Sequence, residues 1–90
     1  MDLIVKYIGN DDKYWSKLKQ KFASDYKHFN LHFLIEHVDE NFNPRKCFVK
    51  TYNENPSIIY VDFSIHEKEC LYFCKLFNRN NSTRLLSLVS

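Results

Sequence analysis

One carboxylate stands at the end of a short apolar segment, where it could take part in chemistry. The segment 57–62 (SIIYVD) is apolar and rich in β-branched residues, so it predicts a buried strand that ends at Asp62. Ligands of open α/β sheets gather at the carboxyl ends of such strands. A carboxylate there could bind a divalent cation, provided that at least one further carboxylate joins it. Asp62 is therefore the first candidate for a functional residue.

The cysteines and histidines indicate packing rather than a redox or zinc site. Cys70 and Cys74 are four residues apart on one face of a helix, whereas a redox pair is normally Cys-x-x-Cys at a helix start. With Cys47 they make an odd number without a disulfide framework, which indicates a reducing, cytoplasmic setting. The four histidines show no i, i+4 pairing of zinc ligands on a helix. We interpret them as surface or packing residues.

The composition predicts one folded domain over residues 1–90. A chain that is 44% hydrophobic and 17% aromatic is not expected to be disordered. Its 13 basic and 11 acidic residues give a net charge of +2, which is too balanced for a dedicated nucleic-acid binder. A single glycine excludes a glycine-rich phosphate loop. No apolar stretch approaches the length of a membrane span, and we expect neither a signal peptide nor a membrane partner.

Hydrophobic periodicity predicts seven elements in the order β-α-β-α-β-α-β. The expected strands are 3–8, 29–36, 57–62 and 85–89. The expected helices begin at Asn10 or Asp11, at Asn43-Pro44, and at Ser64, which has capping-box spacing to Glu67. Each helix would be a right-handed crossover between parallel strands. We therefore expect an open α/β fold with four parallel strands and helices on both faces of the sheet.

From the third strand onward, the chain resembles the receiver domain of bacterial response regulators, which has a flavodoxin-like fold. Receivers carry their phosphorylated aspartate at the end of strand three, and the segment 58–62 (IIYVD) puts Asp62 there. They carry a threonine or serine at the end of strand four, and the segment 85–90 (LLSLVS) ends in Ser90. The resemblance implies a sheet of order 2-1-3-4, with Asp62 as phosphoacceptor and Ser90 as the switch residue.

The chain departs from receivers at the expected metal site. Receivers hold Mg²⁺ with an acidic pair at the end of strand one, where this chain has the segment 7–10 (YIGN). Asp11 and Asp12 follow slightly later, and with Asp62 they are the metal-ligand candidates. Their place in the first turn of a helix favours capping instead. We expect at most weak binding of Mg²⁺ and no other cofactor.

The sequence also ends early for a receiver. After Ser90 there is no counterpart of the fourth helix, of the fifth strand with its lysine, or of the fifth helix. We therefore expect a degenerate, C-terminally truncated receiver domain, which could be a fragment of a longer protein.

Three functions follow from this reading. The first is a non-enzymatic receiver-like module that serves as a protein interaction and dimerisation domain in a bacterial regulatory protein. The second is a working phosphoacceptor domain that uses Asp62. The third is a thioredoxin-like or other small α/β binding domain, whose sheet would contain an antiparallel hairpin near its C-terminal end.

The expected partners are another protein or an adjacent domain, and a second copy of the chain. The first helix is expected to cover one face of the sheet by itself, which leaves apolar residues of strands three and four in need of cover. Strand four, 85–89, is an expected sheet edge with only Arg84 as a charged guard. Pairing of two copies would relieve both defects, so we expect a homodimer whose interface includes strand four and the third helix.

Overall fold

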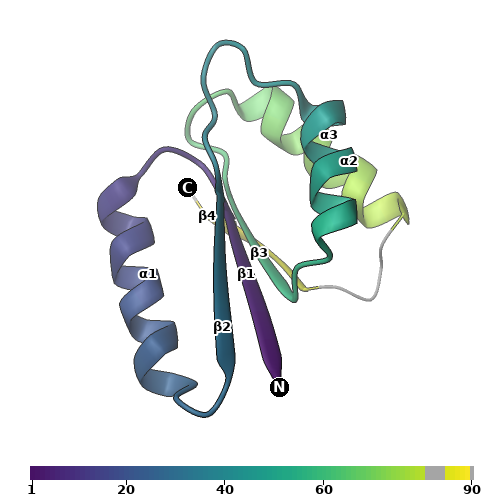
Figure 1. Cartoon of the computed structure of the whole chain (residues 1–90). Coiled ribbons are helices and arrows are strands. Elements are labelled where there is room, and N and C mark those ends of the chain that lie inside the picture. Colours follow the sequence, from purple (N-terminus) through teal and green to yellow (C-terminus); the bar gives the residue numbers. More distant parts are fainter. Residues whose placement is uncertain (81–84, 90) are drawn as a thin grey trace.

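The computed structural model describes the backbone of residues 1–80 and 85–89 and the side chains of residues 1–79. Helices and strands alternate along the chain and build one parallel sheet with helices on both sides (Figure 1). The elements are β1 (Asp2–Ile8), α1 (Asp12–Asp25), β2 (Asn30–Glu36), α2 (Pro44–Glu54), β3 (Ile58–Asp62), α3 (Glu67–Asn80) and β4 (Leu85–Val89). The predicted α/β class with a parallel sheet is confirmed.

The sheet has the order β2-β1-β3-β4, and every described pair of neighbouring strands is parallel. In the register, Ile8 of β1 is opposite both Glu36 of β2 and Val61 of β3. The carboxyl ends of these three strands therefore meet at one end of the sheet, and the loops that follow them lie together. Because β4 runs parallel to β3, the antiparallel C-terminal hairpin of the thioredoxin-like alternative is absent from the described sheet.

The sheet separates two hydrophobic cores, because successive side chains of a strand point to opposite faces. On one face, α1 packs its buried Trp15 and Phe22 against Val5 and Tyr7 of β1. The rings of Tyr7 and Trp15 stack with their centroids 5.4 Å apart. On the other face, α2 and α3 cover a core whose buried members include Ile8, Ile59, Val61, Cys47, Cys70, Phe73, Cys74 and Phe77. Figure 1 shows α1 on one side of the sheet and α2 with α3 on the other.

Local capping chemistry starts the first two helices where the sequence predicts. The Oδ1 atom of Asp11 accepts a hydrogen bond from the amide of Tyr14 at 2.9 Å, which caps α1. The Oδ1 atom of Asn43 accepts from the amides of Arg45 and Lys46 and caps α2, with Pro44 at the first helical position. Both predicted helix starts are confirmed.

The third helix begins later than its predicted capping box. α3 starts at Glu67, and Ser64 lies in the turn before it. The amide and hydroxyl of Ser64 both donate to Oδ1 of Asp62, at 3.0 and 2.7 Å, which makes a local turn instead of a helix cap. His66 then takes a left-handed conformation with φ 52°, and its carbonyl accepts the first helical hydrogen bond, from Cys70. The predicted helix start at Ser64 was wrong: the hydroxyl of Ser64 is held in the turn by Asp62, and the helix starts three residues later, at Glu67.

Candidate functional site

Asp62 lies at the carboxyl end of the central strand β3 and contacts the loop that follows β1. Its Oδ1 atom accepts the two hydrogen bonds from Ser64, and the hydroxyl of Tyr7 donates to its Oδ2 atom at 3.4 Å. The Tyr7 hydroxyl oxygen also accepts a hydrogen bond from the amide of Asp11 at 2.9 Å. The side chain of Tyr7 thus joins the end of β3 to the start of α1, and the predicted position of Asp62 is confirmed.

Gly9 allows this close approach. A Cβ atom at Gly9 would lie 2.6 Å from the Tyr7 hydroxyl oxygen and 2.8 Å from Cβ of Asp62. Both distances are shorter than van der Waals contact, so any side chain at this position would push Tyr7 or Asp62 away. The one glycine of the chain therefore has a steric role in the loop between β1 and α1.

The phenol of Tyr7 is held in its neutral form. Burial raises the pKa of Tyr7 to about 12, and the charges of Asp62 and Asp11 raise it as well, although the Asp11 amide opposes them. A neutral phenol keeps the proton that it donates to Asp62. Both carboxylate oxygens of Asp62 are therefore engaged by donors of this chain.

The other predicted metal ligands have separate roles or fall outside the description. Asp11 caps α1, and Asp12 is an exposed side chain 4.0 Å from the ring of His37. Ser90 lies outside the described residues. Within residues 1–79, no group of three or more His, Cys, Asp or Glu side chains is placed to hold a metal ion. The capping interpretation of Asp11 is confirmed.

The three cysteines lie in the core between the sheet and helices α2 and α3. Cys70 and Cys74 lie on α3, and the thiol of Cys70 donates to the carbonyl oxygen of Asp62 at 3.5 Å. Burial raises the pKa of Cys70 to about 12 and the pKa values of Cys47 and Cys74 to about 11. Such thiols are protonated at neutral pH and poorly nucleophilic, in agreement with the predicted packing role.

A buried lysine is the functional-site feature that sequence reasoning missed. Lys6 lies in the middle of β1 with its side chain 1% exposed, facing α2. Its Nζ atom donates to Oγ1 of Thr51 at 2.8 Å and to Oε1 of Glu54, both on α2. Glu36, at the end of β2, lies 3.8 Å from the same ammonium group. The available signal was a lysine inside an otherwise apolar strand, which required a buried partner.

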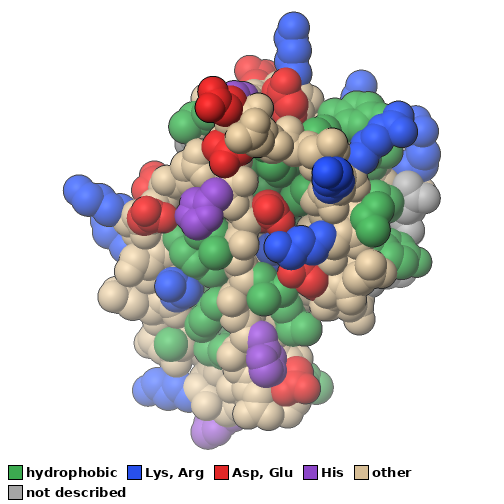
Figure 2. Space-filling view, turned by 45° about the horizontal axis from the view of Figure 1, so that its top comes forward, with side chains coloured by type: hydrophobic (Ala, Val, Ile, Leu, Met, Phe, Trp, Pro, Cys, Tyr) green, Lys and Arg blue, Asp and Glu red, His purple; other side chains and the backbone are tan. Residues whose placement is uncertain are grey.

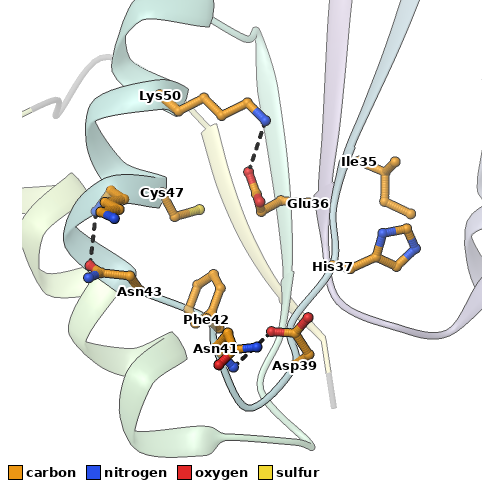
Figure 3. Close-up of a pocket in the computed structure, with 10 residues that line it drawn as sticks. Ile35, Glu36, His37, Asp39, Asn41, Phe42, Asn43, Cys47 and Lys50 are labelled. Atoms are coloured by element: carbon orange, nitrogen blue, oxygen red, sulfur yellow. Dashed lines mark hydrogen bonds and ion pairs between the residues drawn. The ribbon is translucent and has the colours of Figure 1, made fainter.

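An open cavity of about 430 Å³ lies beside this charge cluster, between the end of β2 and α2. Figure 3 shows Cys47 and Lys50 reaching from α2 toward Glu36, with His37 and Asp39 on the strand side. The Nζ atom of Lys50 is 3.4 Å from Oε1 of Glu36. Of the charged side chains in this wall, Glu36 and Lys50 therefore already pair with each other. Lys6 beneath it is a structural cation, because its ammonium group already donates to Thr51 and Glu54 and its side chain is out of reach of solvent.

Comparisons with protein-family models, with curated proteins and with solved structures gave no match to this chain. In residues 1–80 and 85–89, no helix has the length and apolar character needed to cross a membrane.

Proposed function

We propose that this chain is a receiver-like domain that does not transfer phosphoryl groups and that works as a protein interaction and dimerisation module. The parallel sheet with the order β2-β1-β3-β4 and the aspartate at the end of β3 support the receiver comparison. The regulatory setting in bacteria is part of the same proposal and comes from that comparison.

The contacts of Asp62 argue against phosphoryl transfer. A carboxylate that accepts a phosphoryl group needs a free oxygen and a divalent cation held by a second carboxylate. Here Ser64 and Tyr7 donate to the two oxygens of Asp62, and Asp11 caps a helix. The side chains that would build the reaction site instead stabilise the ends of their own strands and helix.

The edge position of β4 is the observation that carries the proposal of association. β4 pairs with β3 on one side and with none of the described strands on the other. Its five residues, 85–89 (LLSLV), include no charge that would oppose pairing with another chain. Two copies related by a two-fold axis would place their β4 strands antiparallel and side by side, which would join the two sheets into one.

Sedimentation equilibrium over a range of concentrations tests this proposal. We expect a mass twice the 10.9 kDa of one chain at tens of micromolar, a range typical of modest dimer affinities. Two variants, Ser87→Pro and Leu88→Pro, each remove one backbone amide of β4, and neighbouring amides of a strand point to opposite sides. The variant that removes the outward amide should keep its circular dichroism spectrum and become monomeric. A wild-type chain that stays monomeric throughout would refute the dimer.

A titration with a phosphate mimic tests the phosphoacceptor alternative. Beryllofluoride with Mg²⁺ mimics an aspartyl phosphate, so a saturable change in the amide resonances around Asp62 would show that its oxygens can be released. Under the present proposal these resonances stay in place.

A further inference from the structure

The outer side of α2 and α3 carries a surface that combines basic and apolar side chains. Three shallow hollows of about 370, 250 and 270 Å³ lie along it. The basic side chains that line them are Arg45, Lys46, Lys50, Lys68 and Lys75. The more apolar ones that are exposed are Val49, Tyr52, Leu71 and Tyr72. We call these nine residues the α2–α3 surface.

The hollows form one continuous surface, because the two on α2 share a side chain and a hydrogen bond links them to the one on α3. Val49, which is 57% exposed, lines both hollows of α2. Arg45 of α2 extends to α3, where its Nε atom donates to the hydroxyl of Tyr72 at 3.2 Å. Its guanidinium group also lies 5.9 Å from the centroid of the Tyr72 ring. Arg45 and Tyr72 therefore join the hollow of α3 to those of α2.

The charge of this surface differs from that of the whole chain. Five cationic side chains line the three hollows, and no carboxylate lines any of them. The chain as a whole has 13 basic and 11 acidic residues, so this surface is more positive than the chain average. Figure 2 shows Lys and Arg side chains beside hydrophobic ones over the part of the molecule where α2 and α3 lie.

We infer that the α2–α3 surface binds an acidic amphipathic helix of a partner protein. Such a helix presents apolar side chains at a spacing of three and four residues, which would enter the hollows around Val49 and Leu71. Carboxylates beside that stripe would meet the lysines that flank the hollows. The inference rests on the proposed function, since it names a partner for the same interaction module, on a surface other than β4.

The geometry favours a protein partner over a nucleic acid or a membrane. Base stacking needs an open aromatic face, but the Arg45 guanidinium lies over the ring of Tyr72. The ring of Tyr52 lies against Phe48, with the centroids 6.0 Å apart. Insertion between lipids needs several apolar side chains side by side, whereas Val49 and Leu71 each stand among the cationic side chains that line the same hollow. Hollows with cationic rims receive the side chains of a peptide.

Fluorescence anisotropy with a synthetic peptide tests the inference on the full chain. The probe is a capped, fluorescein-labelled peptide of about 16 residues, which spans roughly 24 Å as a helix. It has leucines at the helical spacing and glutamates elsewhere, and the control peptide has lysines in place of the glutamates. We expect the acidic peptide to bind with a Kd of roughly tens of micromolar that weakens with added salt, and the lysine peptide not to bind.

Matched protein variants locate the binding. Val49→Glu places a carboxylate between two hollows at an exposed position and should weaken the acidic peptide at least about tenfold. Lys17→Glu makes a larger change of charge on the exposed side of α1 and should change binding less than about twofold. Equal losses in both variants, or equal binding of both peptides, would overturn the inference. So would tighter binding to single-stranded RNA or to phosphatidylserine vesicles than to the acidic peptide.

The two proposals fail separately. A wild-type monomer that binds the acidic peptide would refute the β4 dimer and support this surface. A wild-type dimer that does not bind the peptide would refute the proposed role of the α2–α3 surface and support the β4 dimer. In addition, Val49→Glu should keep the wild-type mass in sedimentation, and the monomeric β4 variant should keep its affinity for the peptide.

Discussion

The stability of the protein should respond unequally to removal of the two members of the buried ion pair, the cation of Lys6 and the anion of Glu54. Glu54→Gln keeps the shape of the side chain but takes away the anion that accepts from Nζ of Lys6. The ammonium group, on a side chain 1% exposed, then keeps Thr51 and the more distant Glu36 at 3.8 Å. Loss of one partner of a buried ion pair costs about 3–5 kcal/mol. Because Glu36 remains, we expect a loss of about 2–3 kcal/mol in the free energy of unfolding.

Lys6→Met should cost less. It removes the buried charge itself. The side chains of Glu36 and Glu54 are 26% and 23% exposed, although Oε1 of Glu36 is itself buried. Both can turn toward water, and Lys50 still pairs with Glu36. The buried hydroxyl of Thr51 loses its hydrogen bond from Nζ but keeps the thiol of Cys47 at 3.8 Å, so the loss costs about 1 kcal/mol. The double variant Lys6→Met/Glu54→Gln should therefore be more stable than Glu54→Gln by about 1 kcal/mol or more.

Urea unfolding followed by circular dichroism measures these differences, against a total stability of roughly 5–13 kcal/mol for a chain of this length. Lys50→Met is the matched control, because Lys50 pairs with the same Glu36 but is 58% exposed, and it should cost no more than about 0.5 kcal/mol. Lys6→Met could instead cost as much as Glu54→Gln, or the double variant could be the least stable of the three. Either result would refute the idea that an unpaired Lys6 ammonium group causes the loss of stability in Glu54→Gln.

Three further predictions concern the region around Asp62 and the core. Gly9→Ala should lower the free energy of unfolding by about 1–3 kcal/mol, because the new Cβ would lie 2.6 Å from the Tyr7 hydroxyl; an unchanged urea midpoint would contradict this packing. Stability should fall as the pH rises from about 9 to 12. Burial holds the pKa values of Cys70 and Tyr7 at about 12, above their ordinary values of 9.0 and 10.0, so the unfolded chain releases these protons first. A urea midpoint that stays flat between about pH 8 and 11 would contradict that linkage. Mg²⁺ should bind at Asp62 with a Kd no tighter than about millimolar, because the carboxylate already accepts from two side chains, and a micromolar value by calorimetry would be against the proposed function.

The elements that could be predicted are those whose signals are local. Pro44 fixes its own φ, and Asn43 caps amides two and three residues away, so α2 starts where the sequence indicates. The same holds for Asp11 at α1. The position of Asp62 at the end of a central strand also follows from its own segment of apolar residues. In each case the interacting groups are near neighbours along the chain.

The features that could not be predicted depend on residues far apart in the sequence. The partners of Lys6 are 30, 45 and 48 positions away, so its role emerges only once β2 and α2 pack on β1. A lysine in an apolar run predicts that some partner exists but does not name it. The predicted start of α3 was wrong for a different reason. Ser64 could either cap the helix or form a turn with its own strand end, and it hydrogen-bonds to Asp62.

The separation of the two cores by the sheet provides natural probes of whether the domain unfolds as one unit. The single tryptophan, Trp15, stacks on Tyr7 in the core beneath α1, whereas all three cysteines lie in the core beneath α2 and α3. Tryptophan emission therefore reports on one layer, and reaction of the thiols with a bulky reagent reports on the other. Coincident transitions would establish two-state cooperativity across the sheet. Thiol reaction before any change in emission would identify α2 and α3 as an independently opening unit, without any substitution in the chain.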